Sequence, residues 1–393
     1  MEQVSQELPQ ARRSVLGCEL PRVVRVVVVC LMAAIPVAYV LRSYASDTKF
    51  SNLLYFGSYF FGRALTEVKA CGPAVTSEFG YDGQFYCQVA IDPLLRHPDA
   101  LRDALDIPAY RATRILVSWL AYVGGVGHPC AIIQAYALLG ICFWLLLLFG
   151  MVHFLRPRTV QDFLCVFAAV MTSGVLFSLH RSLVDLPAAT LAFYAASLTG
   201  GGAVATGAMM LLTKETYFLA LPAVCWPTRK HMVEVAIRLA VVLALPAAWY
   251  LYAHLRLGFM HHDLPNIGLP FAGMIDHVIR AWRNWYPNRI FNPRLSQELF
   301  APFSLLAQAV YLLWRRDPRS AYWRMGIGFA FAYVLLSPDV FVEQLSFTRD
   351  VIPLTVAFNI AMLKQKGWRF AAWFIAGNVG LYWGLWKTVA RVF

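Results

Sequence analysis

Residues Pro129–His153 read PCAIIQAYALLGICFWLLLLFGMVH, an apolar run that contains no aspartate, glutamate, lysine or arginine. At about 20 residues per span, this run is long enough to cross a bilayer as a helix. Comparable runs recur along the 393 residues, which are 59% hydrophobic and 14% charged. Spanning segments must be helices or a closed barrel, and uninterrupted apolar runs exclude the alternating pattern of a barrel. The sequence therefore predicts an all-α, polytopic membrane protein.

Runs of this kind predict about eleven transmembrane helices. They cover residues 22–42, 111–126, 129–153, 160–179, 183–199, 203–226, 232–253, 298–314, 321–337, 351–363 and 369–388. One weaker run between 111 and 226 is open to another interpretation, as a re-entrant or split segment with a break at 200–202 or at Lys214-Glu215. The predicted organisation is a cytoplasmic tail (1–21), a transmembrane module (22–253) that includes a first outer loop (43–110), a second outer loop (254–297) and C-terminal transmembrane helices (298–393).

The formal net charge of +12 would suggest nucleic acid in a soluble protein. Here the basic residues lie in short clusters between apolar runs, as the positive-inside rule describes, so we expect membrane lipids and no nucleic acid as partners. The N-terminal tail is cytoplasmic by this rule, because it carries Arg12, Arg13, Arg22 and Arg25. Counting spans from there puts 228–230, 315–316 and 364–369 on the same side. The count places Arg156-Pro157-Arg158 outside, against the rule.

The first loop contains the segment DGQFYCQVAIDP at residues 82–93. A helical period places Gln84, Gln88 and Asp92 on one row beside an apolar row, which predicts an amphipathic helix lying in the membrane interface with its polar row facing a cavity. Asp82 stands at the start of this helix. It is therefore a candidate for chemistry, and the alternative is that it only caps the helix.

The cysteines show no metal-binding spacing. Cys71 and Cys87 both fall in the first loop, on the predicted oxidising side, so a disulfide between them is one possibility and two free thiols the other. Cysteines within apolar runs are expected to act as small hydrophobic residues: Cys30, Cys130, Cys142, Cys165 and Cys225. In the second loop, His261-His262-Asp263 lacks a spaced third partner, so we predict no metal.

The first loop resembles the signature of GT-C-type membrane glycosyltransferases. The similarity rests on Asp82-Gly83-Gln84-Phe85-Tyr86 with Ala90-x-Asp92-Pro93, and on residues 105–111 leading into Arg114-Ile115-Leu116. The element is also similar to the Trp-Asp-x-x-Trp-Tyr motif of the GPI mannosyltransferases. The resemblance extends more loosely to residues 212–216 and to Arg349. It departs from the family near the end of the first span, where no acidic pair occurs and only Asp47 is near.

This resemblance implies a catalytic carboxylate in the outer first loop, a second outer loop after the seventh span, and a polyprenyl-phosphate sugar as donor, with no further cofactor. The catalytic base that the resemblance implies is Asp82, with Asp47 as the alternative. The expected reaction is inverting sugar transfer to a glycan or lipid acceptor on the outer face of a bacterial inner membrane. The rival interpretation is a transporter or flippase that moves a lipid-linked or small polar solute.

Charged residues in or near apolar runs are functional candidates because charge at membrane depth is costly. Arg181 and Asp185 have the spacing of a helical ion pair, which could instead hold two helices together. The arginines are candidates to hold phosphate, or else reach the interface as snorkelling side chains. The predicted substrate-binding residues are Tyr81, Gln84, Tyr86, Asp92, Arg111, Arg114, His180, Arg181, Asp185, Lys214, Glu215 and Arg349.

Overall fold

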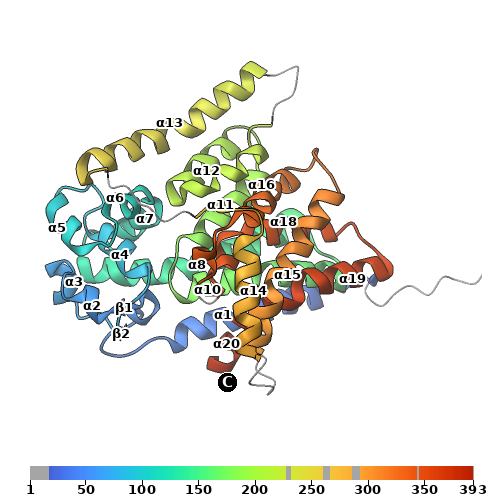
Figure 1. Ribbon diagram of the computed structural model, residues 1–393, viewed down its shortest axis with the longest axis horizontal. Helices are drawn as coiled ribbons and strands as arrows, with labels where there is room; N and C mark the ends of the chain where they lie inside the picture. The colour runs from blue at the N-terminus through green and yellow to red at the C-terminus, as the bar shows by residue number, and fades with distance from the viewer. Residues whose placement is uncertain (1–16, 227–231, 260–265, 286–292, 343–344, 393) are drawn as a thin grey trace, which may run out of the picture.

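The computed structural model describes residues 17–226, 232–259, 266–285, 293–342 and 345–392. The predictions made for Arg12, Arg13, 228–230 and 261–263 lie outside these residues. The described chain is mostly helical, as predicted, with one parallel pair of short strands in the first loop. Figure 1 shows the first-loop elements gathered at one end of the molecule.

The elements follow one another in a long helical series. The first half contains α1 (Arg22–Arg42), η2 (Ser51–Leu54), β1 (Phe56–Gly57), α2 (Ser58–Phe61), α3 (Thr66–Ala70), β2 (Val75–Ser77), α4 (Gly83–Ile91), α5 (Pro98–Ala104), α6 (Pro108–Thr113), α7 (Leu116–Gly124), α8 (Pro129–Leu155), α9 (Val160–Val170), α10 (Ser173–His180) and α11 (Asp185–Ser197). The second half contains α12 (Gly200–Thr213), η3 (Glu215–Ala223), α13 (Met232–Leu257), α14 (Ala272–Trp285), α15 (Pro293–Trp314), α16 (Ala321–Leu335), η5 (Pro338–Phe341), α17 (Ser346–Asp350), α18 (Ile352–Met362), α19 (Gly367–Asn378), η6 (Val379–Leu381) and α20 (Trp383–Val392).

Within the described residues, three helices are long and apolar enough to cross a membrane: α1, α8 and α13. A fourth span results if α9 and α10, which meet at an angle of 46°, are counted together. Helix α13 is the most peripheral of the three and runs along the edge of the molecule in Figure 1. Because most of its apolar side chains are exposed or only partly buried, lipid is their natural solvent. The chain is therefore membrane-embedded.

One predicted span is interrupted at a charged residue, and a second break lies at the boundary between two predicted spans. The run 203–226 divides at Lys214, where α12 ends and the 3-10 helix η3 begins. Helix α10 ends at His180 and α11 starts at Asp185, across a turn in which Ser182 has a positive φ of 47°. A helix break inside a membrane protein is tolerated where it lines a cavity or is buried in protein. The two breaks bring polar backbone groups and charged side chains close to one another.

The prediction of a span at 111–126 is wrong. This segment forms α6 and α7, of six and nine residues, with a break at Arg114. The disulfide between Cys71 and Cys130 places the chain before and after this segment on the same side, so the segment does not cross. The apolar run is only partly buried in the protein, since Trp119, Val123 and Val126 are exposed.

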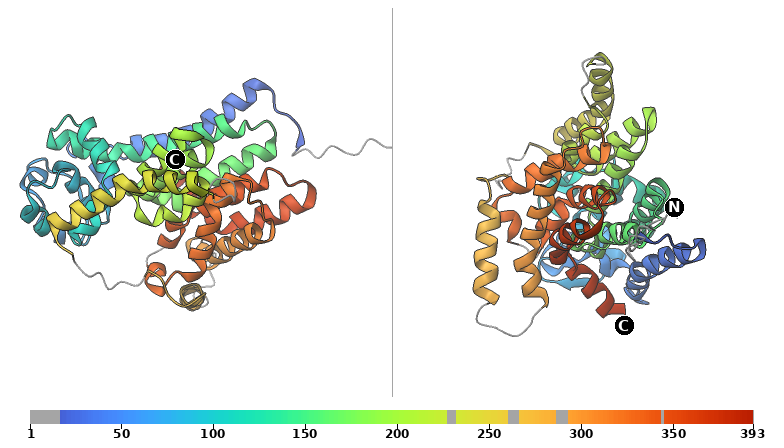
Figure 2. Two further views of the ribbon diagram at one scale, coloured as in Figure 1. Left: turned by 90° about the horizontal axis from the view of Figure 1, so that it is seen from above. Right: turned by 90° about the vertical axis from the view of Figure 1, so that its right-hand side faces the viewer.

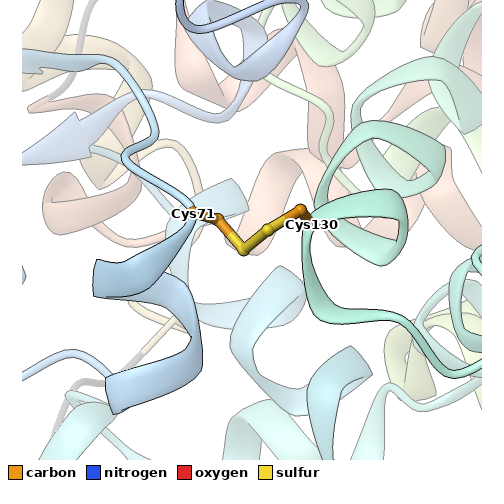
Figure 3. Close-up of a disulfide and its surroundings, with 2 residues drawn as sticks. All are labelled: Cys71 and Cys130. Carbon is orange, nitrogen blue, oxygen red and sulfur yellow. A yellow bond between two sulfur atoms is a disulfide. The ribbon is translucent and has the colours of Figure 1, made fainter.

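A disulfide joins Cys71 of the first loop to Cys130 in the first turn of α8, as Figure 3 shows. The possible Cys71–Cys87 pairing is therefore wrong, and so is the view of Cys130 as only a small hydrophobic residue. Cys87 is a buried free thiol on α4. Because the disulfide joins them, the first loop and the start of α8 lie on the same side.

The opposite end of α8 lies beside the residues that precede α1. The Leu20 amide donates to the Arg158 carbonyl at 2.8 Å, and Glu19 bridges to Thr159. The segment Arg156-Pro157-Arg158 thus shares a side with the basic start of α1, so the count that placed it outside is wrong. Because 111–126 does not cross, α8 runs in the opposite sense from the one predicted.

Helix α4 forms where predicted but does not lie flat in the membrane interface. All residues from Gly83 to Ala90 are buried. Its polar row is used internally, because Gln84 accepts from the Gly57 amide at 2.9 Å and Gln88 from the Leu65 amide at 3.0 Å. These hydrogen bonds connect α4 to earlier parts of the first loop, so the two glutamine side chains do not face a cavity.

The second predicted loop, 254–297, contains a helix. Helix α14 lies within it and packs beside α15, whose helical residues begin at Pro293, and the pair is visible in the right-hand view of Figure 2. The aromatic and apolar side chains of α14 that face outward include Ile275, Ile279 and Trp282. Their spacing of four and three residues makes this face one apolar stripe.

Candidate active site

Asp82 is positioned by two glycines. A side chain at Gly83 would place its Cβ 2.6 Å from the Arg181 carbonyl oxygen, and Gly80 has a φ of +75°, which favours glycine. The Tyr81 amide between them donates to the Tyr55 carbonyl at 2.9 Å. The first loop therefore approaches the turn after α10 closely enough to bring Asp82 beside residues from distant parts of the chain.

The Asp82 carboxylate is held by two guanidinium groups. Its Oδ1 accepts from Arg111 Nη2 at 3.0 Å and its Oδ2 from Arg349 Nη1 at 3.2 Å. The side chain is 24% exposed and makes no capping hydrogen bond, so the interpretation of Asp82 as only a helix cap is wrong. Burial raises the pKa of Asp82, but Arg111 and Arg349 outweigh it and hold the pKa well below its ordinary value.

Arg111 and Arg114 are fixed by carboxylates and a shared tyrosine. Arg111 makes two hydrogen bonds to Asp106, at 2.8 and 2.6 Å, and Arg114 makes two to Glu215, at 2.9 and 2.5 Å. Both guanidiniums also donate to the Tyr86 hydroxyl, at 3.2 and 2.8 Å. Two-point contacts of this kind set both the position and the plane of an arginine.

Lys214 occupies the centre of a second group. Its ammonium nitrogen lies 2.5 Å from Asp185 Oδ1 and 2.6 Å from Asp350 Oδ1. Arg349 Nη1 lies 3.9 Å from Asp185 Oδ2, which connects this group to Asp82. The predicted Arg181–Asp185 ion pair is replaced by the Lys214–Asp185 pair, because the break after α10 turns Arg181 away from the axis of α11.

The ion pairs of the central network join five carboxylates to four cations, so every carboxylate in it has a cationic partner. Its members are Asp82, Asp106, Asp185, Glu215, Asp350, Arg111, Arg114, Lys214 and Arg349. A buried set of ions is tolerated when its members are paired and hydrogen-bonded. A further anion that enters this region must therefore find cations outside these pairs, or displace a carboxylate from one of them.

Such cations lie next to the network, around a small internal cavity. Arg181 stacks on Tyr81 at 4.1 Å and on Phe177 at 4.3 Å from the ring centroids, and it has no ion pair within the described chain. The cavity has a volume of about 30 Å³, and its lining includes Tyr39, Tyr55, Phe177, His180, Arg181, Glu298 and Lys387. Arg391 adjoins it and donates to the Tyr39 hydroxyl at 3.0 Å. Among the described residues around the cavity, the cations are Arg181, Lys387 and Arg391 and the acid is Glu298.

Most of the residues predicted from the sequence meet at this site, and three do not contribute side chains to the network. Gln84 bonds to backbone groups, as described above. His180 is buried, stacks on Tyr39 at 3.9 Å and bonds to Thr388 at 2.9 Å, so it lines the small cavity instead. Asp92 lies at the far end of α4 and accepts from the His97 amide.

Asp47, the alternative base, lies in an exposed turn between α1 and η2. It makes no ion pair with any residue that the structure describes. Asp82, in contrast, is flanked by two arginines. Of these two carboxylates, Asp82 is the one that belongs to the cluster of charged residues.

Several members of the site were not predicted from the sequence. Asp106 and Asp350 are immediate partners of predicted cations, and a signal existed for both: Asp350 adjoins Arg349, and Asp106 lies five residues before Arg111. Lys387 and Arg391 gave no such signal, because they belong to a C-terminal helix far from the other residues in the sequence.

Comparisons with protein-family models, with curated proteins and with solved structures found no match. The chemical capacity of the site follows from its residues. A partly exposed carboxylate suits proton acceptance, and an adjacent cavity with an excess of positive charge suits an anion. The described residues contain no group of three or more histidine, cysteine, aspartate or glutamate side chains arranged to hold a metal ion.

Proposed function

We propose that this protein is an inverting glycosyltransferase that moves a sugar from a polyprenyl-phosphate donor to a glycan or lipid acceptor. The observation that carries the proposal is the Asp82 carboxylate, held between Arg111 and Arg349 next to a cation-rich cavity in a membrane-embedded chain. The GT-C resemblance of the segment around Asp82 agrees with this assignment. A lipid-linked donor also suits a site surrounded by membrane helices.

In the proposed reaction, the hydroxyl oxygen of the acceptor attacks the anomeric carbon as the bond from that carbon to the phosphate oxygen breaks. The hydroxyl proton passes to Asp82, and the lipid phosphate leaves with the electron pair. A phosphate is a stable anion, so no general acid is required. A single displacement inverts the anomeric configuration.

The donor phosphate binds at Arg181, Lys387 and Arg391. The arginines first considered for this role, Arg111, Arg114 and Arg349, already have carboxylate partners. The cavity next to Arg181 has three cations against Glu298, so an anion there improves the charge balance. Arg349 and Arg181 both contact the Tyr81 ring, at 5.2 and 4.1 Å, and this ring links the phosphate cavity to Asp82.

The proposed topology has eleven crossings, with the N-terminus inside and the active site outside. Segment 111–126 is removed from the predicted set, and the run 203–226 becomes two crossings, α12 outward and η3 back. Contacts along the inner side support this order: Arg324 donates to the Pro222 carbonyl at 2.8 Å, and Lys364 pairs with Asp317 at 2.7 Å. The order also moves Arg156-Pro157-Arg158 to the cytoplasm, where the positive-inside rule places it. The proposed location is a bacterial inner membrane.

The helix breaks around buried charges also favour a second candidate, a transporter or flippase for a lipid-linked or small polar solute. Transporters bind their solutes at discontinuous helices near the middle of the membrane. The breaks at His180–Asp185 and at Lys214 have this character. A transporter, however, leaves the covalent bonds of its solute intact.

The two candidates are separated by an assay in detergent, where no second compartment exists. Purified protein is incubated with a polyprenyl-phosphate sugar and an acceptor glycan, and release of polyprenyl phosphate is measured. The transferase predicts release that depends on the acceptor and forms a new glycosidic bond. Binding of the donor without any release would favour the transporter and contradict the proposed function.

A further inference from the structure

A second cleft lies at the opposite end of α4 from Asp82. It has a volume of about 520 Å³ and is open to solvent. Asp92, which was predicted to support Asp82, lines this cleft instead. With a rise of about 1.5 Å per residue along α4, Asp82 and Asp92 are separated by about 15 Å. The residues of α4 between them are buried, so the cleft is distinct from the active site.

Hydrogen bonds and the disulfide hold the backbone around the cleft in place. Gln88 of α4 fixes one wall through the Leu65 amide, and the disulfide at Cys71 holds the end of α3 against α8. On the other wall, Arg256 of α13 donates to the Leu95 carbonyl at 2.9 Å. Leu95 has a φ of 53°, a left-handed conformation that an L-residue keeps only when its surroundings impose it. The cleft is therefore a fixed feature of the first loop.

The lining combines both signs of charge with hydrogen-bonding groups. Its ionisable side chains are Arg63, Arg96, His97, Glu67, Asp92 and Asp103. Exposed Tyr122 adds an aromatic ring at the rim, and Ala64, Leu65, Pro93 and Leu101 form an apolar floor. An anion would meet three carboxylates, and a cation would meet two arginines, so neither kind of charged ligand is matched by the cleft.

We propose that this cleft binds a neutral carbohydrate chain. Sugar hydroxyls both donate and accept hydrogen bonds, so they use carboxylates and guanidiniums side by side. The apolar face of a sugar ring packs against an aromatic side chain such as Tyr122. Carbohydrate binding in the cleft does not depend on the proposed function. We further assign this carbohydrate as the distal part of the acceptor, and this assignment does rest on the proposed function. It places the bound sugars about 15 Å from the reacting hydroxyl.

The test measures binding by the full chain in a detergent that carries no sugar. The probes are four linear neutral hexasaccharides, of glucose, mannose, galactose and arabinose, and binding is followed by saturation-transfer NMR. We expect at least one hexasaccharide to bind. Asp103→Ala and Tyr122→Ala should each weaken that binding by roughly tenfold or more, because the first removes a charged hydrogen-bond acceptor and the second removes the aromatic ring.

The matched control is Asp99→Ala, on the same helix as Asp103 but outside the cleft, which should bind as the unaltered protein does. Asp82→Asn should also bind normally, so failure of the proposed transfer reaction leaves this result unaffected. Equal melting temperatures of the variants show that binding is lost without unfolding. The inference is overturned if no hexasaccharide binds, if both cleft variants bind unchanged, or if glycerophosphoethanolamine alone occupies the cleft, which would make it a headgroup site.

Discussion

At the scale of single residues, the resting state of Asp82 is poorly suited to accept a proton, because two guanidiniums stabilise its charged form. A general base works best when its pKa is close to the working pH. We propose that donor binding supplies the required change. A phosphate bound beside Arg181 adds negative charge near Asp82 and competes for Arg349, so we expect the pKa of the carboxyl to rise. In this proposal, the event that binds the donor also activates the base.

The first prediction concerns the pH dependence of transfer. Because Arg349 lowers the pKa of Asp82, its replacement in Arg349→Gln should raise that pKa, and the acid limb of the kcat/KM profile should move to higher pH. Arg349→Lys keeps the positive charge and should move the limb less. The profiles are measured between pH 4 and pH 8, and an acid limb at the same pH in both variants would contradict the role given to Arg349.

The second prediction concerns Lys214, which neutralises Asp185 and Asp350. Lys214→Met should lower the free energy of unfolding by about 3–5 kcal/mol, because it leaves two carboxylates without their buried partner. The control is Lys364→Met, whose side chain is 72% exposed and should change stability little. Thermal unfolding of both variants in detergent provides the comparison. Equal melting temperatures would show that Lys214 does not hold the network.

At the scale of elements, the apolar pattern was sufficient to predict α1 and α8 to within two residues, because length and composition alone determine a membrane helix. It was not sufficient for 111–126, because hydropathy does not show that this apolar run breaks at Arg114 into two short helices. The break at Lys214-Glu215 was one of two that the sequence suggested, since charge at membrane depth requires one.

The sequence did not show which residues far apart in the chain contact one another. Arg349 and Asp82 are 267 residues apart, and no local pattern relates them. Cys130 similarly looked like part of an apolar run, because hydropathy does not tell which end of a span faces the first loop. The sequence therefore identified Asp82, Arg111 and Arg349 as candidate site residues, but it did not predict the contacts between them.

The third prediction concerns the disulfide as a connection between α3 and α8. Cys71 and Cys130 are separated by 59 residues, and the loop they close contains Asp82 and Arg111. Cys71→Ser should reduce stability by up to about 4 kcal/mol if constraint of the unfolded chain dominates. The double variant Cys71→Ser with Cys130→Ser should match the single one, and Cys18→Ser serves as the control. A double variant much less stable than Cys71→Ser would mean that the two thiols act separately.

At the scale of the whole molecule, two sets of contacts define opposite sides. One contains the disulfide and the active site, and the other contains the Leu20–Arg158 contact. The long helix α8 joins them, with Cys130 near one end and Arg156 just beyond the other. The orientation in the membrane then follows from the basic residues near Arg158.

The fourth prediction tests this orientation by labelling. In a background with Cys18, Cys30 and Cys142 replaced by serine, single cysteines are introduced as Glu67→Cys and Arg158→Cys. A membrane-impermeant thiol reagent applied to intact spheroplasts should label the cysteine at position 67. The cysteine at position 158 should react only after permeabilisation. Labelling of position 158 in intact spheroplasts would reverse the proposed topology and put the active site inside the cell.

The most direct test of the account is sugar transfer by Asp82→Asn, which keeps the shape of the side chain but removes the proton-accepting charge. The purified variant should insert and bind the donor lipid, yet form the glycosidic product about 10²- to 10⁴-fold more slowly. Asp106→Asn is the matched control, because it removes another carboxylate partner of Arg111 and should lose far less activity. Full transfer by Asp82→Asn from a polyprenyl-phosphate donor would contradict the assignment of this carboxylate as the base.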